Sequence, residues 1–159
     1  MLGGARSGKS RYAESLFTGA VRYLAAARVR DADFAARVAE HRNRRPATWT
    51  TVEGDLVAAL QEHRPTLLDD VGTWLTNLID DAAAWEQPRG TVDPAPLVAA
   101  VAGFPDRLVV VSPEVGLGVV PHTESGRLFR DELGLLNQQL ADVCDEVVLV
   151  VAGQPLRVK

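Results

Sequence analysis

The sequence predicts an α/β protein with a mostly parallel sheet that is covered by helices on both faces. Short β-prone or apolar runs alternate with segments of helical periodicity along most of the chain. Successive strands joined by helices return to the sheet through right-handed crossovers, which makes them parallel. The chain has 159 residues, and 47% of them are hydrophobic. This length and composition fit a single domain, residues 1–159, with an ordinary core.

The elements are predicted from periodicity, caps and turn residues. Asp31 can cap a helix, Trp49 lies among three threonines in a β-prone run, and three prolines with Gly90 predict a loop at 86–96. The expected helices are 8–17, 31–43, 55–63, 71–85, 97–104 and 123–144. The expected strands are 21–26, 48–52, 66–70, 108–112 and 146–152, with a short edge strand at 156–158. The apolar stripe of the last helix predicts core or a subunit interface.

A phosphate-binding loop begins at the third residue. Its pattern is Gly-x-x-x-x-Gly-Lys-Ser, formed by Gly3, Gly4, Ala5, Arg6, Ser7, Gly8, Lys9 and Ser10. In this pattern backbone N–H groups surround phosphate oxygens, Lys9 reaches the β- and γ-phosphates, and the Ser10 hydroxyl can bind Mg²⁺. The alternative is a glycine-rich turn that merely precedes a helix. With the alternating elements, the loop predicts a three-layer, RecA-like P-loop NTPase fold that binds nucleotides.

The strand that should lead into this loop is short in the sequence. A phosphate loop normally follows a central buried strand, but only Met1 and Leu2 precede Gly3. We therefore expect a truncated or missing first strand and weakened stability. Adding an apolar strand of about five residues upstream should raise the melting temperature.

Composition limits the other function classes. The net charge of −4 argues against general nucleic-acid binding, which is usually accompanied by a basic surplus. Cys144 is the single cysteine, so neither an intrachain disulfide nor a cysteine-based zinc site is expected. The N-terminus lacks a signal-peptide pattern, and no apolar run approaches the roughly 20 residues of a membrane helix. A protein of the reducing cytoplasm, without membrane insertion, is expected.

Asp69 is the expected second metal ligand. It ends the apolar strand that begins at Thr66, and an acid in this place commonly completes the Mg²⁺ shell of phosphate-loop enzymes. The alternative role is an N-cap for the helix that begins at Val71, which suits Asp70 better. Since both residues are acidic, the two assignments could be exchanged. The metal site predicted from sequence is Ser10 with Asp69.

His41 stands among positive charges: Arg37, Arg42, Arg44 and Arg45 lie within four residues of it. The simpler interpretation is a solvated histidine at a helix C-terminus. The functional one is a nucleophile towards phosphorus, with arginines that neutralise phosphates and lower the imidazole pKa. His63 is expected on the surface, whereas His122 and Glu114 lie in loops that could approach a substrate. No Asn-Lys-x-Asp pattern for reading guanine occurs.

The chain resembles the bifunctional adenosylcobinamide kinase/adenosylcobinamide-phosphate guanylyltransferase family of cobalamin biosynthesis. The resemblance covers nearly the whole chain, and the two blocks from His41 to Glu53 and from Glu114 to Pro121 are the most specific. The matching segments are the phosphate loop with Arg11, Ala13 and Glu14; Ala36-Arg37-Val38; Arg45-Pro46-x-x-Trp49-x-Thr51-x-Glu53; Leu67-Leu68-Asp69; Trp74-Leu75-Thr76-Asn77-Leu78; Glu114-Val115-Gly116-x-Gly118-x-Val120-Pro121; Phe129-Arg130-Asp131; Leu136-Asn137-Gln138; and Asp145-Glu146-Val147-x-Leu149-Val150-Val151-Ala152-Gly153.

The resemblance implies two reactions on one site. The enzyme would phosphorylate a hydroxyl of adenosylcobinamide with ATP or GTP. It would then transfer GMP from GTP to that phosphate through a guanylylated histidine, here His41, releasing pyrophosphate. The resemblance assigns nucleotide contacts to Ala26, Ala27, Arg28, Arg42, Asn43, Arg44, Arg45, Glu53 and Asp69. It also implies a homotrimer, whereas no residue is assigned as the base of the kinase step.

The chain departs from the family at a few positions besides its short start. Pro113 stands where the family often has an asparagine, and Ala26 and Ala27 replace hydroxyl residues, which would weaken polar contacts there. Two other functions stay open. A phosphate-loop kinase for another small alcohol would release no pyrophosphate from GTP. A nucleotide-dependent binding module would hydrolyse slowly and transfer no group.

Overall fold

The computed structural model describes residues 1–26 and 46–159, and within them seven strands form one sheet. The strands lie in the order β3-β2-β4-β5-β1-β6-β7. Every neighbouring pair is parallel except the antiparallel pair of β6 and β7. The strands are β1 (Leu2–Gly3), β2 (Arg22–Ala25), β3 (Thr50–Glu53), β4 (Thr66–Asp69), β5 (Leu108–Pro113), β6 (Val148–Val151) and β7 (Gln154–Arg157). The predicted α/β class is confirmed.

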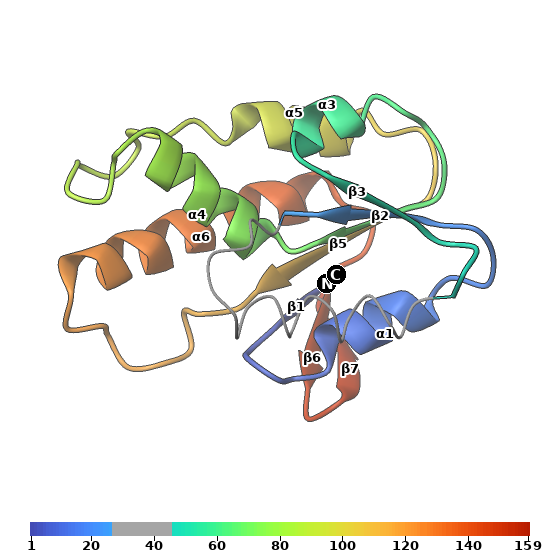
Figure 1. The fold of residues 1–159 in the computed structure, drawn as a ribbon. Helices are drawn as coiled ribbons and strands as arrows, with labels where there is room; N and C mark the ends of the chain where they lie inside the picture. Colours follow the sequence, from blue (N-terminus) through green and yellow to red (C-terminus); the bar gives the residue numbers. More distant parts are fainter. Residues whose placement is uncertain (27–45) are drawn as a thin grey trace.

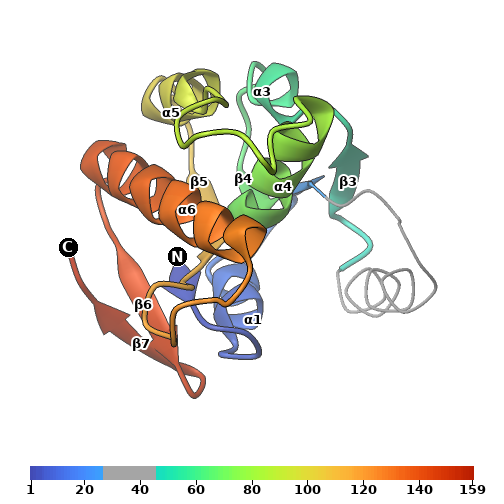
Figure 2. The same ribbon diagram turned by 90° about the vertical axis from the view of Figure 1, so that its left-hand side faces the viewer.

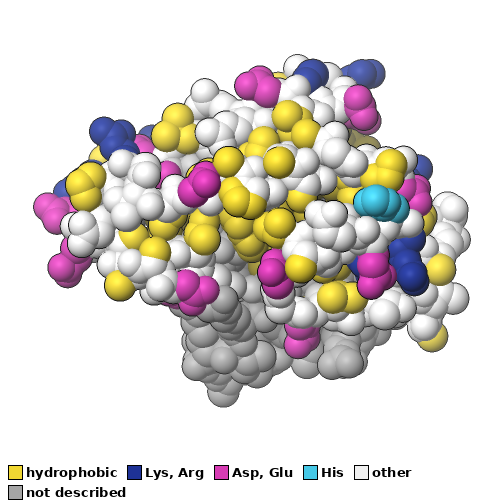
Figure 3. All heavy atoms as spheres, turned by 90° about the horizontal axis from the view of Figure 1, so that it is seen from above, with side chains coloured by type: hydrophobic (Ala, Val, Ile, Leu, Met, Phe, Trp, Pro, Cys, Tyr) yellow, Lys and Arg dark blue, Asp and Glu magenta, His cyan; other side chains and the backbone are white. Residues whose placement is uncertain are grey.

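Helices cover the sheet from two sides, which gives three layers (Figures 1 and 2). The helices of the described part are α1 (Lys9–Ser15), α3 (Leu56–Ala59), α4 (Val71–Asp81), α5 (Ala95–Ala102) and α6 (Glu124–Val143). α1 lies on one face, and α3 to α6 lie together on the other. Figure 3 looks onto the helices of this second face, where apolar side chains gather in the middle and charged ones lie around them.

The core is divided by the sheet, because successive strand residues point to opposite faces. In β4, Leu67 packs in the smaller cluster with Ala13 of α1, whereas Leu68 packs in the larger cluster beneath α3 to α6. Leu133, Leu136 and Leu140 of α6 are buried in that larger cluster. The stripe predicted for this helix is therefore core. Both faces of the central strands are covered, as their continuous apolar runs predict.

Most predicted elements are confirmed, but several ends are shifted. The helix predicted at 71–85 ends at Asp81, because Ala83 adopts a positive φ of 49° and the Ala84 N–H donates to the Ile79 carbonyl. α5 begins two residues before the predicted 97, since proline is tolerated in a first helical turn. The predicted helix 55–63 shortens to α3, capped by Asp55. The predicted helix at 31–43 lies outside the described residues.

The first strand is two residues long, as expected, and it lies at the centre of the sheet between β5 and β6. The amino group of Met1 donates to the Val110 carbonyl at 2.8 Å, and the Ser112 N–H donates to the Met1 carbonyl at 2.9 Å. The Glu114 N–H donates to the Gly3 carbonyl at 3.0 Å. These bonds hold the start of the phosphate loop directly against β5.

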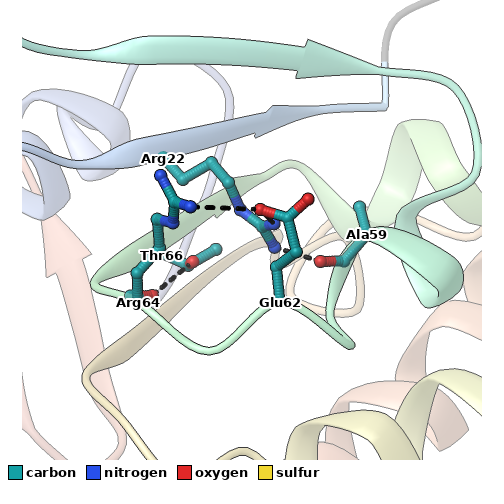
Figure 4. Close-up of polar contacts among 5 residues, drawn as sticks. All are labelled: Arg22, Ala59, Glu62, Arg64 and Thr66. Atoms are coloured by element: carbon teal, nitrogen blue, oxygen red, sulfur yellow. Dashed lines mark hydrogen bonds and ion pairs between the residues drawn. The ribbon is translucent and has the colours of Figure 1, made fainter.

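A buried arginine stabilises the opposite end of the sheet, where β2 and β4 begin (Figure 4). Arg22 is 2% exposed, and its guanidinium donates to the Ala59 carbonyl and lies 2.9 Å from the Glu62 carboxylate. Glu62 also lies 3.5 Å from Arg64, on the surface. The Thr66 hydroxyl donates to the Arg64 carbonyl at 2.7 Å. These contacts join β2 and β4 to the segment that connects α3 with β4.

Candidate functional site

The candidate site lies at the carboxyl edge of the sheet, where parallel strands end together. Ala25 of β2 is the register partner of Glu53 on one side and of Asp69 on the other. Gly3, at the end of β1, is opposite Pro113 of β5 and Val150 of β6. The structure therefore brings the phosphate loop, Asp69 and Glu53 to one edge. Glu53, on the edge strand, is exposed.

The phosphate loop adopts a curled conformation that depends on its glycines. Gly8 has a φ of 93° and Arg6 one of 55°, and the Ser7 N–H donates to the Gly4 carbonyl at 3.3 Å. A Cβ on Gly3 would lie 2.9 Å from the Val150 carbonyl oxygen and collide with the Ser7 hydroxyl. Glycine is needed at Gly3 for space and at Gly8 for backbone conformation.

Several polar groups of the loop are left for an anion. Gly8 precedes α1 without a side-chain cap, so the first N–H groups of the helix keep their hydrogen-bonding capacity. The Ser7 Oγ atom is buried without a hydrogen-bond partner in the described part of the chain. Lys9 Nζ makes a long contact of 3.4 Å to the Gly4 carbonyl. An anion seated in the loop would satisfy these donors, as predicted for phosphate.

The turn between β6 and β7 supports the loop, which sequence reasoning missed. The Gly153 N–H donates to the Ser7 carbonyl at 2.8 Å, and a Cβ on Gly8 would lie 3.2 Å from the Gly153 Cα. Ala152 and Gly153 have φ values of 50° and 78°, as in a two-residue hairpin turn with two left-handed residues. Ala152-Gly153 closes the last segment of the resemblance, which was the available sequence signal.

Asp69 and Asp70 have different partners. Asp70 caps α4 by accepting the Thr73 N–H at 2.7 Å, which confirms the alternative role considered for it. Asp69 accepts the Tyr23 hydroxyl at 2.9 Å. Since strand residues alternate, Asp69 shares the face of Leu67, on which α1 packs. Asp69 is thereby directed to the side of the sheet from which Lys9 and Ser10 start.

Burial raises the pKa of Asp70 above its ordinary value, and the negative charge of Asp69 adds to this effect. The hydrogen bond from Thr73 and the positive charge of Lys9 oppose the increase in the pKa. The sequence predicts Asp70 as the cap of α4 and leaves open its exchange with Asp69 as the metal ligand.

The residues present fit a hard divalent cation. The Ser10 hydroxyl at the start of α1 and the Asp69 carboxylate on the α1 face are oxygen ligands of the kind that Mg²⁺ prefers. The Tyr23 hydroxyl donates to the Oδ2 atom of Asp69 and so orients this carboxylate. Among the described residues, no group of three or more histidine, cysteine or acidic side chains could hold a metal ion by itself.

Two buried asparagines hold strand ends at the site. Asn77 of α4 donates its amide to the Ala26 carbonyl, just after β2, at 2.8 Å. Asn137 of α6 donates to the Pro113 carbonyl at 3.1 Å and accepts the Ser112 hydroxyl at 2.6 Å. These amides fix the directions in which the chain leaves β2 and β5. Both asparagines lie in segments that carry the family resemblance, although no role was assigned to them.

The remaining candidates are dispersed or lie outside the described residues. Glu114 is half-buried at the site edge and accepts the Gly116 N–H at 2.6 Å. His63, at the other end of the sheet, stacks edge-on against Phe104, and His122 is exposed. Trp49 packs between Phe17 and Tyr23, as expected for core. The residues outside are Ala27, Arg28, His41, Arg42, Asn43, Arg44 and Arg45.

Comparison with known proteins identifies the family. The family model described as cobinamide kinase/cobinamide phosphate guanyltransferase matches residues 1–158. The chain belongs to this family. A bifunctional adenosylcobalamin biosynthesis protein (CobP) of Pseudomonas aeruginosa is 42% identical over 170 residues, covering all of this chain and 95% of the relative. Relatives named bifunctional adenosylcobalamin biosynthesis protein (CobU) in Escherichia coli and Salmonella typhimurium are 38% and 39% identical, with 98% of each covered.

Membership confirms the resemblance seen in the sequence and the class of enzyme. The cobinamide kinase/guanyltransferase family acts in group transfer, so the chain is a transferase that uses nucleotides. The phosphate loop, with its uncapped helix start and the buried Ser7 hydroxyl, is the part of the structure that matches this chemistry. Within the described residues, no helix is long and apolar enough to cross a membrane.

Proposed function

We propose that this chain phosphorylates a hydroxyl of adenosylcobinamide with ATP or GTP and then transfers GMP from GTP to the new phosphate. The products of the second reaction are adenosylcobinamide-GDP and pyrophosphate. The observation that carries the proposal is the phosphate loop at the sheet edge, in a chain whose full length matches the family. The cobinamide named in the family description supplies the substrate class.

Binding of the triphosphate is assigned to the loop and its neighbours. The N–H groups at the start of α1 and the Ser7 hydroxyl donate to phosphate oxygens, while Lys9 places a positive charge beside them. Ser10 and Asp69 would hold Mg²⁺, which neutralises negative charge on the phosphates. Ala26, Ala27, Arg28, Arg42, Asn43, Arg44, Arg45 and Glu53 complete the proposed nucleotide contacts, as the resemblance implies.

His41 is the proposed nucleophile of the second reaction. Neutral imidazole forms a bond to the α-phosphorus of GTP, and the bond from that phosphorus to the bridging oxygen breaks as pyrophosphate leaves. The phosphate of adenosylcobinamide phosphate then attacks the same phosphorus, and the histidine leaves with its ring restored. The neighbouring arginines would stabilise the leaving pyrophosphate. Two displacements at one phosphorus thus replace one difficult transfer.

We also infer a homotrimer in the cytoplasm as the working form. The family resemblance supports the trimer, and the single cysteine fits a reducing compartment. Sedimentation velocity checks the trimer: a species of about one chain mass at micromolar concentration would contradict it.

The decisive test is covalent labelling by GTP. The protein is incubated with α-labelled GTP and Mg²⁺ and denatured in alkali, where a phosphoramidate survives. Label is expected on the unaltered protein and on His63→Ala and His122→Ala, which remove the other two histidines. His41→Ala is expected to carry no label but to fold normally. Label retained by His41→Ala would refute the histidine assignment.

The same proteins distinguish the proposed function from that of a kinase without nucleotidyl transfer. A kinase without nucleotidyl transfer would phosphorylate its alcohol in all four proteins and release no pyrophosphate from GTP. The proposed function predicts that GTP alone releases one pyrophosphate per labelled His41, and that release continues over many turnovers only when adenosylcobinamide phosphate is present. Kinase activity alone would reduce the assignment to the first reaction.

A further inference from the structure

We propose that the loop after β5 presents an apolar platform on which the corrin ring of the acceptor substrate lies while its hydroxyl reaches the phosphate loop. The platform consists of the side chains of Leu117, Val119 and Val120, which are 82%, 92% and 58% exposed. The residues that bind the nucleotide do not account for this second substrate. The inference deepens the proposed function and rests on it, because the cobinamide comes from the family description.

The exposure of these three side chains is unusual within the molecule. Val119 and Leu117 are the two most exposed large apolar side chains among the described residues, and Val120 follows directly in the same loop. Covering apolar surface is favourable roughly in proportion to the area that is removed from water. Single exposed apolar residues are ordinary, but three within four positions indicate a surface that another molecule covers.

Hydrogen bonds on both sides of the platform hold the backbone of the loop in place. Arg130 of α6 donates to the Gly116 carbonyl at 2.6 Å, and Arg127 donates to the His122 carbonyl at 2.7 Å. The Glu114 carboxylate accepts the Gly116 N–H at 2.6 Å. The apolar side chains between these anchors are left in water. A surface that is arranged before binding loses less conformational entropy when a ligand covers it.

The side chains of the loop define the chemistry of its occupant. From Val115 to Pro121 the sequence is Val-Gly-Leu-Gly-Val-Val-Pro, without a charged or hydrogen-bonding side chain. The guanidinium groups of Arg127 and Arg130 are directed to backbone carbonyls of the loop and its flank. A phosphate or another anion therefore gains little here, whereas a broad apolar surface gains by being buried. The corrin ring of a cobinamide has such a face and carries its amide groups at the rim.

The position of the loop beside the phosphate loop suits the acceptor of the phosphoryl group. The Glu114 N–H donates to the Gly3 carbonyl at 3.0 Å, so the loop leaves the sheet next to the first residue of the phosphate loop. Figure 1 shows the segment after β5 projecting beyond the carboxyl edge of the sheet before it returns to α6. The hydroxyl of a cobinamide lies at the end of an arm that is attached to the rim of the corrin ring. The ring must therefore lie away from the nucleotide phosphates, in the direction that this loop takes.

The test measures phosphorylation as a function of adenosylcobinamide concentration at saturating nucleotide. The double variant Leu117→Ser/Val119→Ser should raise the KM for adenosylcobinamide by about tenfold, with kcat changed less than about twofold, because apolar contact is lost in binding. The double variant Leu117→Met/Val119→Ile keeps the apolar surface and should keep the original KM. Val158→Ser alters a side chain that is 64% exposed at the amino end of the sheet, and it should also keep the original KM. An unchanged KM in the serine double variant would overturn the proposal.

Labelling by GTP alone distinguishes a failure of this inference from a failure of the proposed function. The labelling reaction uses no corrinoid, so its rate in the serine double variant should stay within about twofold of the rate in the unaltered protein. A much larger fall would assign the loop to the nucleotide site and contradict the platform. An unaltered protein that does not phosphorylate adenosylcobinamide would refute the proposed function and, with it, the inference that rests on it.

A second copy of the chain is the other molecule that could cover the platform. Sedimentation velocity without corrinoid compares the unaltered protein with the serine double variant. We expect equal sedimentation coefficients, because the platform is covered by substrate and not by protein. Dissociation of the variant into smaller species would identify a partner chain as the occupant and refute the proposal.

Discussion

The two ends of the parallel sheet pair their buried polar groups to different extents. At the amino end, two nitrogens of the buried Arg22 guanidinium contact the Ala59 carbonyl and the Glu62 carboxylate, and its Nε atom has no partner in the described part of the chain. At the carboxyl end, the Ser7 hydroxyl is buried without a partner in the described part of the chain, and α1 starts without a side-chain cap. Buried polar groups lower stability unless they are paired. The comparison suggests that the first end serves stability and the second serves a ligand.

The largest expected effect is a loss of activity without a loss of stability when Lys9, at the carboxyl end of the sheet, is replaced. Lys9→Ala should reduce both transfer reactions by about 1,000-fold, because a charge beside the phosphates is lost. Its melting temperature without nucleotide should stay within about 2 °C. Phosphorylation and pyrophosphate release measure the first effect, and thermal unfolding measures the second. Lys159→Ala removes the chain's other lysine, which bonds carbonyls at the end of α6, and should retain activity. Full activity of Lys9→Ala would remove the loop from the mechanism.

At the amino end of the sheet, we expect a loss of stability with little loss of activity. Arg22→Ala should lower the free energy of unfolding by about 3 kcal/mol, since it empties a buried position and leaves the Ala59 carbonyl without this donor. Turnover per folded molecule should change less than about twofold. Arg64→Ala, which removes the exposed partner of Glu62, should cost less than about 1 kcal/mol. Urea unfolding of both variants measures this difference, and similar losses for both would show that burial is not the cause.

Two glycines with left-handed backbone conformations separate an effect on stability from an effect on nucleotide binding. Gly8 (φ 93°) lies in the phosphate loop near Gly153, whereas Gly90 (φ 79°) has open space for a Cβ. Either Gly→Ala change should cost about 1–2 kcal/mol of stability through backbone strain. We expect only Gly8→Ala to weaken GTP binding as well, by about tenfold, because the loop must shift. Titration calorimetry with GTP measures the affinity; equal affinities would show that the loop tolerates the shift.

The smallest expected effect is the pH dependence of stability that the Asp70 carboxyl causes. Its pKa is raised in the folded protein, so the folded state holds a proton more tightly than the unfolded state. The stability contributed by this proton is complete below the ordinary pKa of 3.8 and is lost as pH rises through the folded pKa. Asp70→Asn retains a side-chain oxygen for the Thr73 N–H and should be more stable than the unaltered protein at pH 7, by about 1 kcal/mol. The advantage should shrink in acid; a difference in melting temperature that does not vary with pH would contradict it.

The sequence was sufficient for features that depend on local chemistry. The phosphate loop is defined by residue types at fixed spacing, and the α/β class follows from the alternation of periodicities. The roles of Leu133 and Leu136 in the core follow from helical spacing. Asp70 as the cap of α4 also followed, because capping is a contact between near neighbours.

Tertiary structure alone decided which distant residues meet. The contact of Gly153 with Ser7 joins residues at opposite ends of the chain, and the amides of Asn77 and Asn137 bond carbonyls far away in sequence. Which strands flank β1, namely β5 and β6, depends on the order of strands in the sheet. Hydrogen-bond pairing across a sheet is non-local, so neither propensity nor spacing along one segment encodes it.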